Sequence, residues 1–102
     1  MILTTTNSIE GFKIIEYKGI VSGVAVHIKK MKMTFNMQKY YAAMGESISE
    51  IKEQALQQLK ENAEKLNANA VIGIKVDIEL TVSSYVTVSV TGTAVNTAYK
   101  KE

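Results

Sequence analysis

The sequence predicts an α+β domain in which a curved, mostly antiparallel sheet packs against one long helix. Two patterns support this prediction: residues 70–94 alternate between apolar and polar side chains, and residues 47–66 place apolar side chains at helical spacing. The 102 residues are 46% hydrophobic and 22% charged and include no Pro or Cys, which is the composition of an ordinary globular protein. We therefore expect residues 1–102 to form a single domain.

The first segment, residues 2–26, predicts a short strand, a turn and a longer strand. It is rich in Ile, Val and Thr and is interrupted at Asn7-Ser8. The longer strand has two apolar faces, one formed by Ile20, Val24 and Val26 and the other by Val21, Gly23 and Ala25. The small side chains there allow another backbone to approach closely.

Residues 27–45 fit two patterns. From His27 to Met37 the side chains alternate as in a strand, whereas a helical spacing joins Met33, Met37, Tyr40, Tyr41 and Met44. The period alone does not choose between the two. These residues hold four Lys and no acidic side chain, so they form a basic segment that is rich in Met and Tyr.

A helix is predicted between Ser47 and Leu66. Ser47-Ile48-Ser49-Glu50 has the spacing of a capping box, which marks the start of many helices. Apolar residues then follow at helical intervals: Ile48, Ile51, Ala55, Leu59, Ala63 and Leu66. Asn67 comes next, and Asn tolerates the left-handed conformation that ends many helices, so we expect the helix to end there.

Two long strands are predicted after this helix. In the first, one face holds Ala70, Ile72, Ile74, Val76, Ile78 and Leu80, and the other holds Lys75, Asp77, Glu79 and Thr81. After Ser83-Ser84, a second strand places Val86, Val88, Val90, Gly92 and Ala94 on one face. We expect the two strands to pair as an antiparallel hairpin.

The charge and the side-chain inventory argue against two classes of function. The formal net charge is +2, and all twelve basic residues are Lys, which lacks the fork with which Arg reads guanine. We therefore expect no specific binding of nucleic acid. One His, one Asp and no Arg or Cys leave few side chains for a catalytic centre, so we do not expect an enzyme.

Two further observations concern the compartment. No segment approaches the roughly 20 consecutive apolar residues of a membrane span. The first residues do not form a basic leader followed by an apolar run. The expectation is a cytoplasmic protein without a membrane span.

Short motifs at both ends of the chain are those of one protein family. They are Thr4-Thr5-Thr6, Ile9-Glu10-Gly11, the run from Glu16 to Val26, the run from Ala68 to Ile74 with Asp77 and Glu79, and Thr91-Gly92-Thr93-Ala94-Val95. In these motifs the chain resembles the YbjQ-like proteins, small bacterial and archaeal domains of uncharacterised function that are sometimes labelled as heavy-metal-binding. The resemblance implies an α+β domain that assembles into a homopentameric ring.

The expected sheet favours self-association on physical grounds as well. In a chain of this length, one helix cannot cover strands that are apolar on both faces. A closed ring of copies would cover these faces together with the exposed strand edges. We therefore expect a homo-oligomeric binding module with sites at the junctions between subunits.

Three residues are candidate metal ligands at such junctions. Asp77 and Glu79 share the polar face of one expected strand, so several copies could direct carboxylates toward one hard cation. His27 offers an imidazole, and it is followed by thioethers that suit Cu(I), in Met31, Met33 and Met37. Each group of candidate ligands also has a structural interpretation. Asp77 and Glu79 can simply form a solvated face of the strand, and the methionines can fill space in the core or in an interface. The expected ligand is a metal ion or another small ligand.

An alternative function is a structural scaffold. In this interpretation the Lys/Met/Tyr segment 27–45 recognises a protein partner, whose identity the sequence does not indicate.

Overall fold

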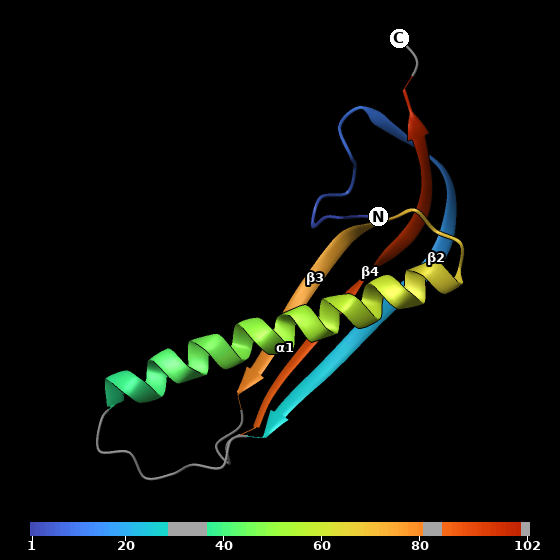
Figure 1. Cartoon of the computed structure of the whole chain (residues 1–102). Coiled ribbons are helices and arrows are strands. Elements are labelled where there is room, and N and C mark those ends of the chain that lie inside the picture. Colours follow the sequence, from blue (N-terminus) through green and yellow to red (C-terminus); the bar gives the residue numbers. More distant parts are fainter. Residues whose placement is uncertain (29–36, 81–84, 101–102) are drawn as a thin grey trace.

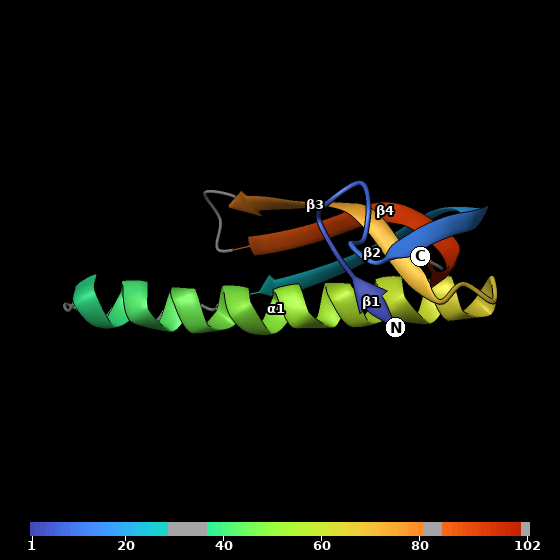
Figure 2. The same ribbon diagram turned by 90° about the horizontal axis from the view of Figure 1, so that it is seen from above.

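The computed structural model describes residues 1–28, 37–80 and 85–100 (Figure 1). These residues form the elements β1 (Ile2–Leu3), β2 (Phe12–Ile28), α1 (Met37–Lys65), β3 (Ala70–Leu80) and β4 (Tyr85–Tyr99). The strands form one sheet in the order β1-β3-β4-β2. α1 lies across one face of this sheet, so the fold has two layers (Figure 2). The predicted α+β class is confirmed.

The sheet is antiparallel except at one edge. β1 runs parallel to β3 and pairs with it over only two residues, Ile2 with Ala70 and Leu3 with Val71. β4 pairs antiparallel with both β3 and β2. The predicted hairpin is therefore confirmed, and so is the short strand followed by a longer one. The predicted inner face of β4 is also confirmed, since it is buried at Val86, Val88, Val90, Gly92 and Ala94.

α1 covers the sheet with one stripe of side chains. Ile51, Ala55, Leu59 and Ala63 recur every four residues, and each is at most 2% exposed. They pack into the main core with residues of β2 and β4, including Val21, Ala25, Val86, Val88 and Val90. The predicted apolar face of the helix is confirmed. Within the described residues, no helix is both long and apolar enough to cross a membrane.

The two ends of α1 differ in how well they were predicted. The start at Ser47 is wrong, because α1 already begins at Met37 and the Ser47-Ile48-Ser49-Glu50 motif lies inside it. Helix-favouring residues such as Gln38, Lys39, Ala42 and Ala43 extend it backward. The end at Asn67 is confirmed by its positive φ of 60°.

Backbone hydrogen bonds close this end of the helix. Asn67 N donates to Glu64 O at 2.9 Å and Ala68 N donates to Ala63 O at 3.1 Å. This pair of bonds is the Schellman motif, which satisfies carbonyl groups that the last turn would leave unpaired.

The two alternatives for residues 27–45 both apply in part. His27 and Ile28 complete β2, whereas the backbone from Met37 onward is helical. Residues 29–36 lie outside the described part of the chain. The segment therefore contains the end of β2 and the start of α1.

A bulge interrupts the predicted alternation of β3. The pairing with β4 shifts between Ile72 and Lys75, and Gly73 has a φ of 61°, in the left-handed region that favours glycine. As a result Ala70 and Ile72 belong to a small second cluster, whereas Ile74 packs into the main core beneath α1. The prediction that all six apolar residues of β3 share one face is wrong because a strict period of two does not allow for a bulge.

β2 and α1 approach each other very closely at Gly23. A Cβ atom at this position would lie 2.0 Å from the carbonyl oxygen of Ala55, which is well inside van der Waals contact. The prediction that small residues in this strand admit another backbone is confirmed. Because Ala55 is also small, the helix axis comes near the sheet at this point.

We expect Gly23→Ala to lower the free energy of unfolding by about 1–3 kcal/mol, because the added methyl group forces α1 away from β2. Urea unfolding at fixed protein concentration measures the loss. Ser22→Ala is the matched control, since Ser22 is exposed and its substitution should change stability by less than about 0.5 kcal/mol. Equal stability of Gly23→Ala and the native chain would contradict the close contact.

Candidate functional site

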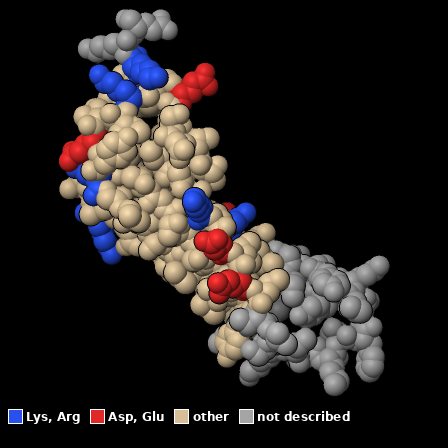
Figure 3. Space-filling view, turned by 180° about the vertical axis from the view of Figure 1, so that it is seen from behind, with Lys and Arg blue, Asp and Glu red and all other residues tan. Residues whose placement is uncertain are grey.

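The face of the sheet that is turned away from α1 carries three columns of different chemistry. The pairing register places Ile20, Val24 and Val26 of β2 beside Thr93, Ser89 and Thr87 of β4. It places Thr91, Ser89 and Thr87 of β4 beside Lys75, Asp77 and Glu79 of β3. Ser22 of β2, which pairs with Thr91, lies on the same face between Ile20 and Val24. In Figure 3, which shows this face, charged side chains form small groups in a surface that is otherwise free of charge. The strand order thus separates an apolar column from an acidic one.

The apolar column of β2 is exposed. Ile20 is 84% exposed, Val24 is 49% exposed and Val26 is 55% exposed. We call these three residues the β2 strip. Single exposed apolar side chains are common on monomers, whereas three on one strand, here interrupted by Ser22, favour an interaction surface.

A second exposed strip lies on the other face of the sheet, at the end of β3. Val76, Ile78 and Leu80 pair with Val90, Val88 and Val86, which are buried beneath α1. α1 covers these β4 residues but leaves their β3 partners 39%, 45% and 57% exposed. We call Val76, Ile78 and Leu80 the β3 strip. The two strips therefore lie on opposite faces and near opposite edges of the sheet.

The edge of β2 is closed in part by side chains from α1. Val24 N donates to Gln58 Oε1 at 3.1 Å, and Asn62 Nδ2 donates to Ser22 O at 2.8 Å. Gln58 and Asn62 are four residues apart, so they lie on one side of the helix, next to the buried stripe. This closure was not predicted, although polar residues beside a buried helical stripe were a signal for it.

The edge of β3 is open beyond the bulge. β1 pairs only with Ala70 and Val71, and Thr4 O accepts from Ile74 N at 3.0 Å. From Lys75 to Leu80, no hydrogen bond to another described residue forms on the side away from β4. Unpaired backbone groups at such an edge are a template for another strand.

The candidate metal ligands lie on both faces of the sheet. Asp77 and Glu79 are exposed on the outer face, opposite Ser89 and Thr87. His27 pairs with Val86 on the face that carries α1, so β4 and the thickness of the sheet separate it from the two acids. Within one chain the structure brings Asp77 and Glu79 together but not His27.

The methionine part of the Cu(I) hypothesis lies outside the described residues. This applies to Met31 and Met33 and to the side chain of Met37. Among the residues that are described, no group of three or more His, Cys, Asp or Glu side chains is arranged to hold a metal ion.

Comparisons with known proteins agree with the resemblance seen in the sequence. Residues 1–98 match a family model, YbjQ_1, that is described as "Putative heavy-metal-binding". A UPF0145 protein of Persephonella marina is 43% identical over 101 residues, which cover 93% of this chain and 97% of that protein. A UPF0145 protein of Clostridium kluyveri is 41% identical over 88 residues, which cover 78% of this chain and 81% of that protein.

A solved structure has the same fold. It is a protein of unknown function from Pediococcus pentosaceus, assigned to the DUF74 family, and it superimposes with a TM-score of 0.68 at 24% sequence identity. The match covers 94% of this chain and 96% of that one. At this identity the similarity supports the fold alone.

The described residues of a single chain do not fit a heavy-metal site. Soft heavy metals favour thiolate ligands, and the chain has no Cys and only one His. The two acids that do lie together are hard oxygen ligands, which suit Mg²⁺, Ca²⁺ or Mn²⁺ better. A complete coordination sphere would need ligands from more than one copy.

We expect Gln58→Ala to expose the backbone amide of Val24 and to lower the free energy of unfolding by about 1 kcal/mol, because that amide loses its acceptor. Hydrogen exchange of the Val24 amide should become faster. Gln57→Ala is the matched control, since Gln57 is the neighbouring residue of the same type and bonds Glu61 on the exposed side of α1. Unchanged exchange of Val24 in Gln58→Ala would show that α1 does not close this edge.

Proposed function

Because the chain belongs to the YbjQ-like family, whose members have no characterised activity, we propose that it is a non-catalytic binding module built as a ring of identical copies. The resemblance points to five copies, each a single domain of residues 1–102. In this proposal the ring acts in the cytoplasm and binds a metal ion or another small ligand at the junctions between copies.

The observation that carries the proposal is the pair of exposed apolar strips. The β2 strip and the β3 strip lie on opposite faces of the sheet, so they cannot both be buried by a two-fold contact of one patch with itself. A contact between the β2 strip of one copy and the β3 strip of the next is heterologous. Repetition of a heterologous contact closes into a ring when the rotation allows it.

The hydrogen bonding of the two strand edges supports the same heterologous contact. Gln58 and Asn62 occupy part of the edge of β2, whereas the edge of β3 from Lys75 to Leu80 is open. The open edge lies beside the β3 strip. A neighbouring copy that covers the strip can therefore pair with the edge at the same time.

This contact would also bring the candidate ligands closer to one another. It turns the outer face of one copy, which carries Asp77 and Glu79, toward the α1 face of the next, which carries His27. A complete ligand set would then draw on more than one copy, because no single copy brings the two carboxylates and the imidazole together. This is why we assign the ligand site to the junction.

A binding role fits the chemistry better than catalysis does. The matched relatives carry no enzymatic name. The His and the acids that an acid–base centre would need lie on opposite faces of one chain.

We expect the native chain to sediment as a pentamer at micromolar concentration and the variants Ile20→Lys and Ile78→Lys to be monomers. Each variant places a charge in one of the two strips, and a buried unpaired ammonium is strongly unfavourable. Analytical ultracentrifugation measures the mass. Gln54→Lys is the control, since Gln54 is exposed on α1 and the same charge there should leave the ring intact.

A mixture of the two strip variants tests the heterologous contact directly. Ile20→Lys keeps an intact β3 strip and Ile78→Lys keeps an intact β2 strip, so the mixture should form a dimer of one copy of each. A contact of one patch with itself would give no such dimer. A native chain that is monomeric and unaffected by dilution would refute the ring.

We expect the assembled native chain to retain a metal ion or to be stabilised by one. A metal present at about 100 times its Kd raises the free energy of unfolding by about 2.7 kcal/mol. Elemental analysis and thermal unfolding with Cu, Zn, Ni, Ca, Mg and Mn salts measure this effect. Asp77→Asn with Glu79→Gln should abolish it, whereas Glu50→Gln with Glu53→Gln, two exposed acids of α1, should not. Absence of any response in the native chain would contradict metal binding.

A further inference from the structure

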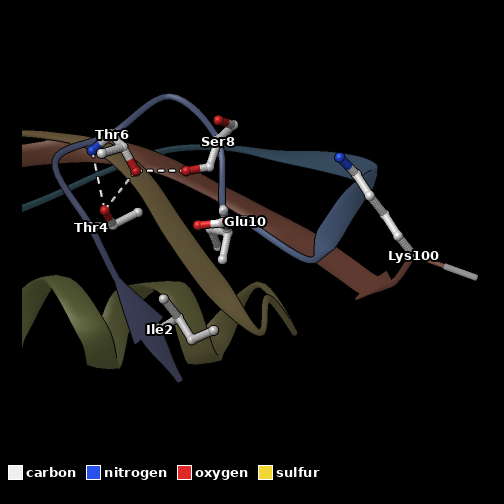
Figure 4. Close-up of a pocket in the computed structure, with 7 residues that line it drawn as sticks. Ile2, Thr4, Thr6, Ser8, Glu10 and Lys100 are labelled. Carbon is white, nitrogen blue, oxygen red and sulfur yellow. Dashed lines mark hydrogen bonds between the residues drawn. The ribbon is translucent and has the colours of Figure 1, made fainter. Parts of the chain in front are cut away.

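A cavity of about 600 Å³ lies between the N-terminal segment and the end of β4 (Figure 4). Pockets of about 300–1000 Å³ are typical for small-molecule ligands. Neither Asp77 and Glu79 nor His27 lines this cavity, so it is distinct from the candidate metal site proposed above. The cavity combines apolar, hydroxyl and charged side chains, and each kind restricts what can bind.

Hydrogen bonds orient two of the three hydroxyl groups in the cavity wall, those of Thr4 and Thr6. Thr6 Oγ1 lies 2.6 Å from the carbonyl oxygen of Ser8, and because a carbonyl only accepts, the Thr6 hydroxyl donates. Thr6 Oγ1 must then accept the 2.8 Å bond from Thr4 Oγ1. Thr4 Oγ1 in turn accepts from Thr6 N at 3.2 Å. The hydroxyl hydrogens of Thr4 and Thr6 are thus both used, so these two groups offer only lone pairs to a ligand.

The backbone holds this wall in place. Thr4 N donates to Val71 O at 3.0 Å, and Thr4 O accepts from Ile74 N at 3.0 Å. Thr6 O accepts from Gly73 N at 2.8 Å. The wall is therefore attached on both sides of the Gly73 bulge, so the acceptors are preorganised before a ligand arrives.

Two opposite charges flank these acceptors. Glu10 and Lys100 line the cavity, and Lys100 N donates to Gly11 O at 2.9 Å, which ties the end of β4 to the residue after Glu10. In Figure 4 the Lys100 side chain extends on the other side of Glu10 from the two threonines. Among the described residues, no ion pair joins Glu10 to Lys100. Each charge is available to a ligand.

From this arrangement we infer that the cavity binds a small zwitterion of the aliphatic amino-acid type. An ammonium group has three donors and no acceptor, which matches the Glu10 carboxylate and the free lone pairs of Thr4 and Thr6. The same lone pairs repel a carboxylate, which instead binds Lys100. Ile2 and Ile9 provide an apolar surface for the side chain of the ligand.

L-leucine is the probe, and isothermal titration of the full chain measures its binding. We expect saturable binding of leucine and at least about tenfold weaker binding of N-acetyl-leucine, which lacks the ammonium, and of leucinamide, which lacks the carboxylate. Weaker binding of only one analogue, or no saturable binding of leucine at millimolar concentration, would overturn the inference.

Two variants assign each charge of the ligand to its partner. Glu10→Gln should weaken leucine and leucinamide but not N-acetyl-leucine, and Lys100→Met should weaken leucine and N-acetyl-leucine but not leucinamide. Glu53→Gln and Lys75→Met make the same changes of charge outside the cavity and should leave the affinity for leucine unchanged. Equal losses for all three compounds in either cavity variant would refute the assigned orientation. Sedimentation of the same samples measures whether each one forms the proposed ring, so a failure to bind leucine is distinguishable from a failure of assembly.

Discussion

The close contact between α1 and β2 determines which parts of the sheet are covered. Gly23 allows the backbone of α1 at Ala55 to come against the strand, and Gln58 and Asn62 bond the adjacent edge. The helix is therefore held over β2, β4 and the start of β3. The described residues leave the end of β3 partly exposed on that face and β2 partly exposed on the opposite face, which gives the two apolar strips. In our account both strips, and the need for neighbouring copies, follow from where one helix can lie.

Local signals predicted much of this fold. The spacing of Ile51, Ala55, Leu59 and Ala63 identified the buried face of α1, and the tolerance of Asn67 for positive φ identified its end. The start of α1 was not predicted correctly, because Ser and Glu at capping-box spacing are equally compatible with a helix interior. The bulge at Gly73 was missed for a related reason. A glycine within an alternating pattern permits a bulge without requiring it, and the decision depends on contacts with the N-terminal segment, which are distant in sequence.

The candidate sites likewise divide into features that local sequence patterns predict and features that depend on long-range contacts. Alternation along β3 was sufficient to place Asp77 and Glu79 on one polar face. Their relation to His27 depends on the strand order and on the number of strands between them, neither of which a hydrophobic period specifies. The cavity could not be predicted at all. Thr4 and Thr6 form its wall because their backbone docks on the Gly73 bulge, so one glycine affects both the packing of β3 and the shape of the cavity.

The central claim is that a neighbouring copy covers the open edge of β3. Hydrogen exchange of the backbone amides from Lys75 to Leu80, followed as the protein is diluted, tests it most directly. The account predicts that amides directed away from β4 are protected at high protein concentration and lose this protection on dilution, while amides bonded to β4 keep theirs. Rapid exchange of the outward amides at every concentration would contradict the claim, because the edge would then be open to water in the protein as it exists in solution.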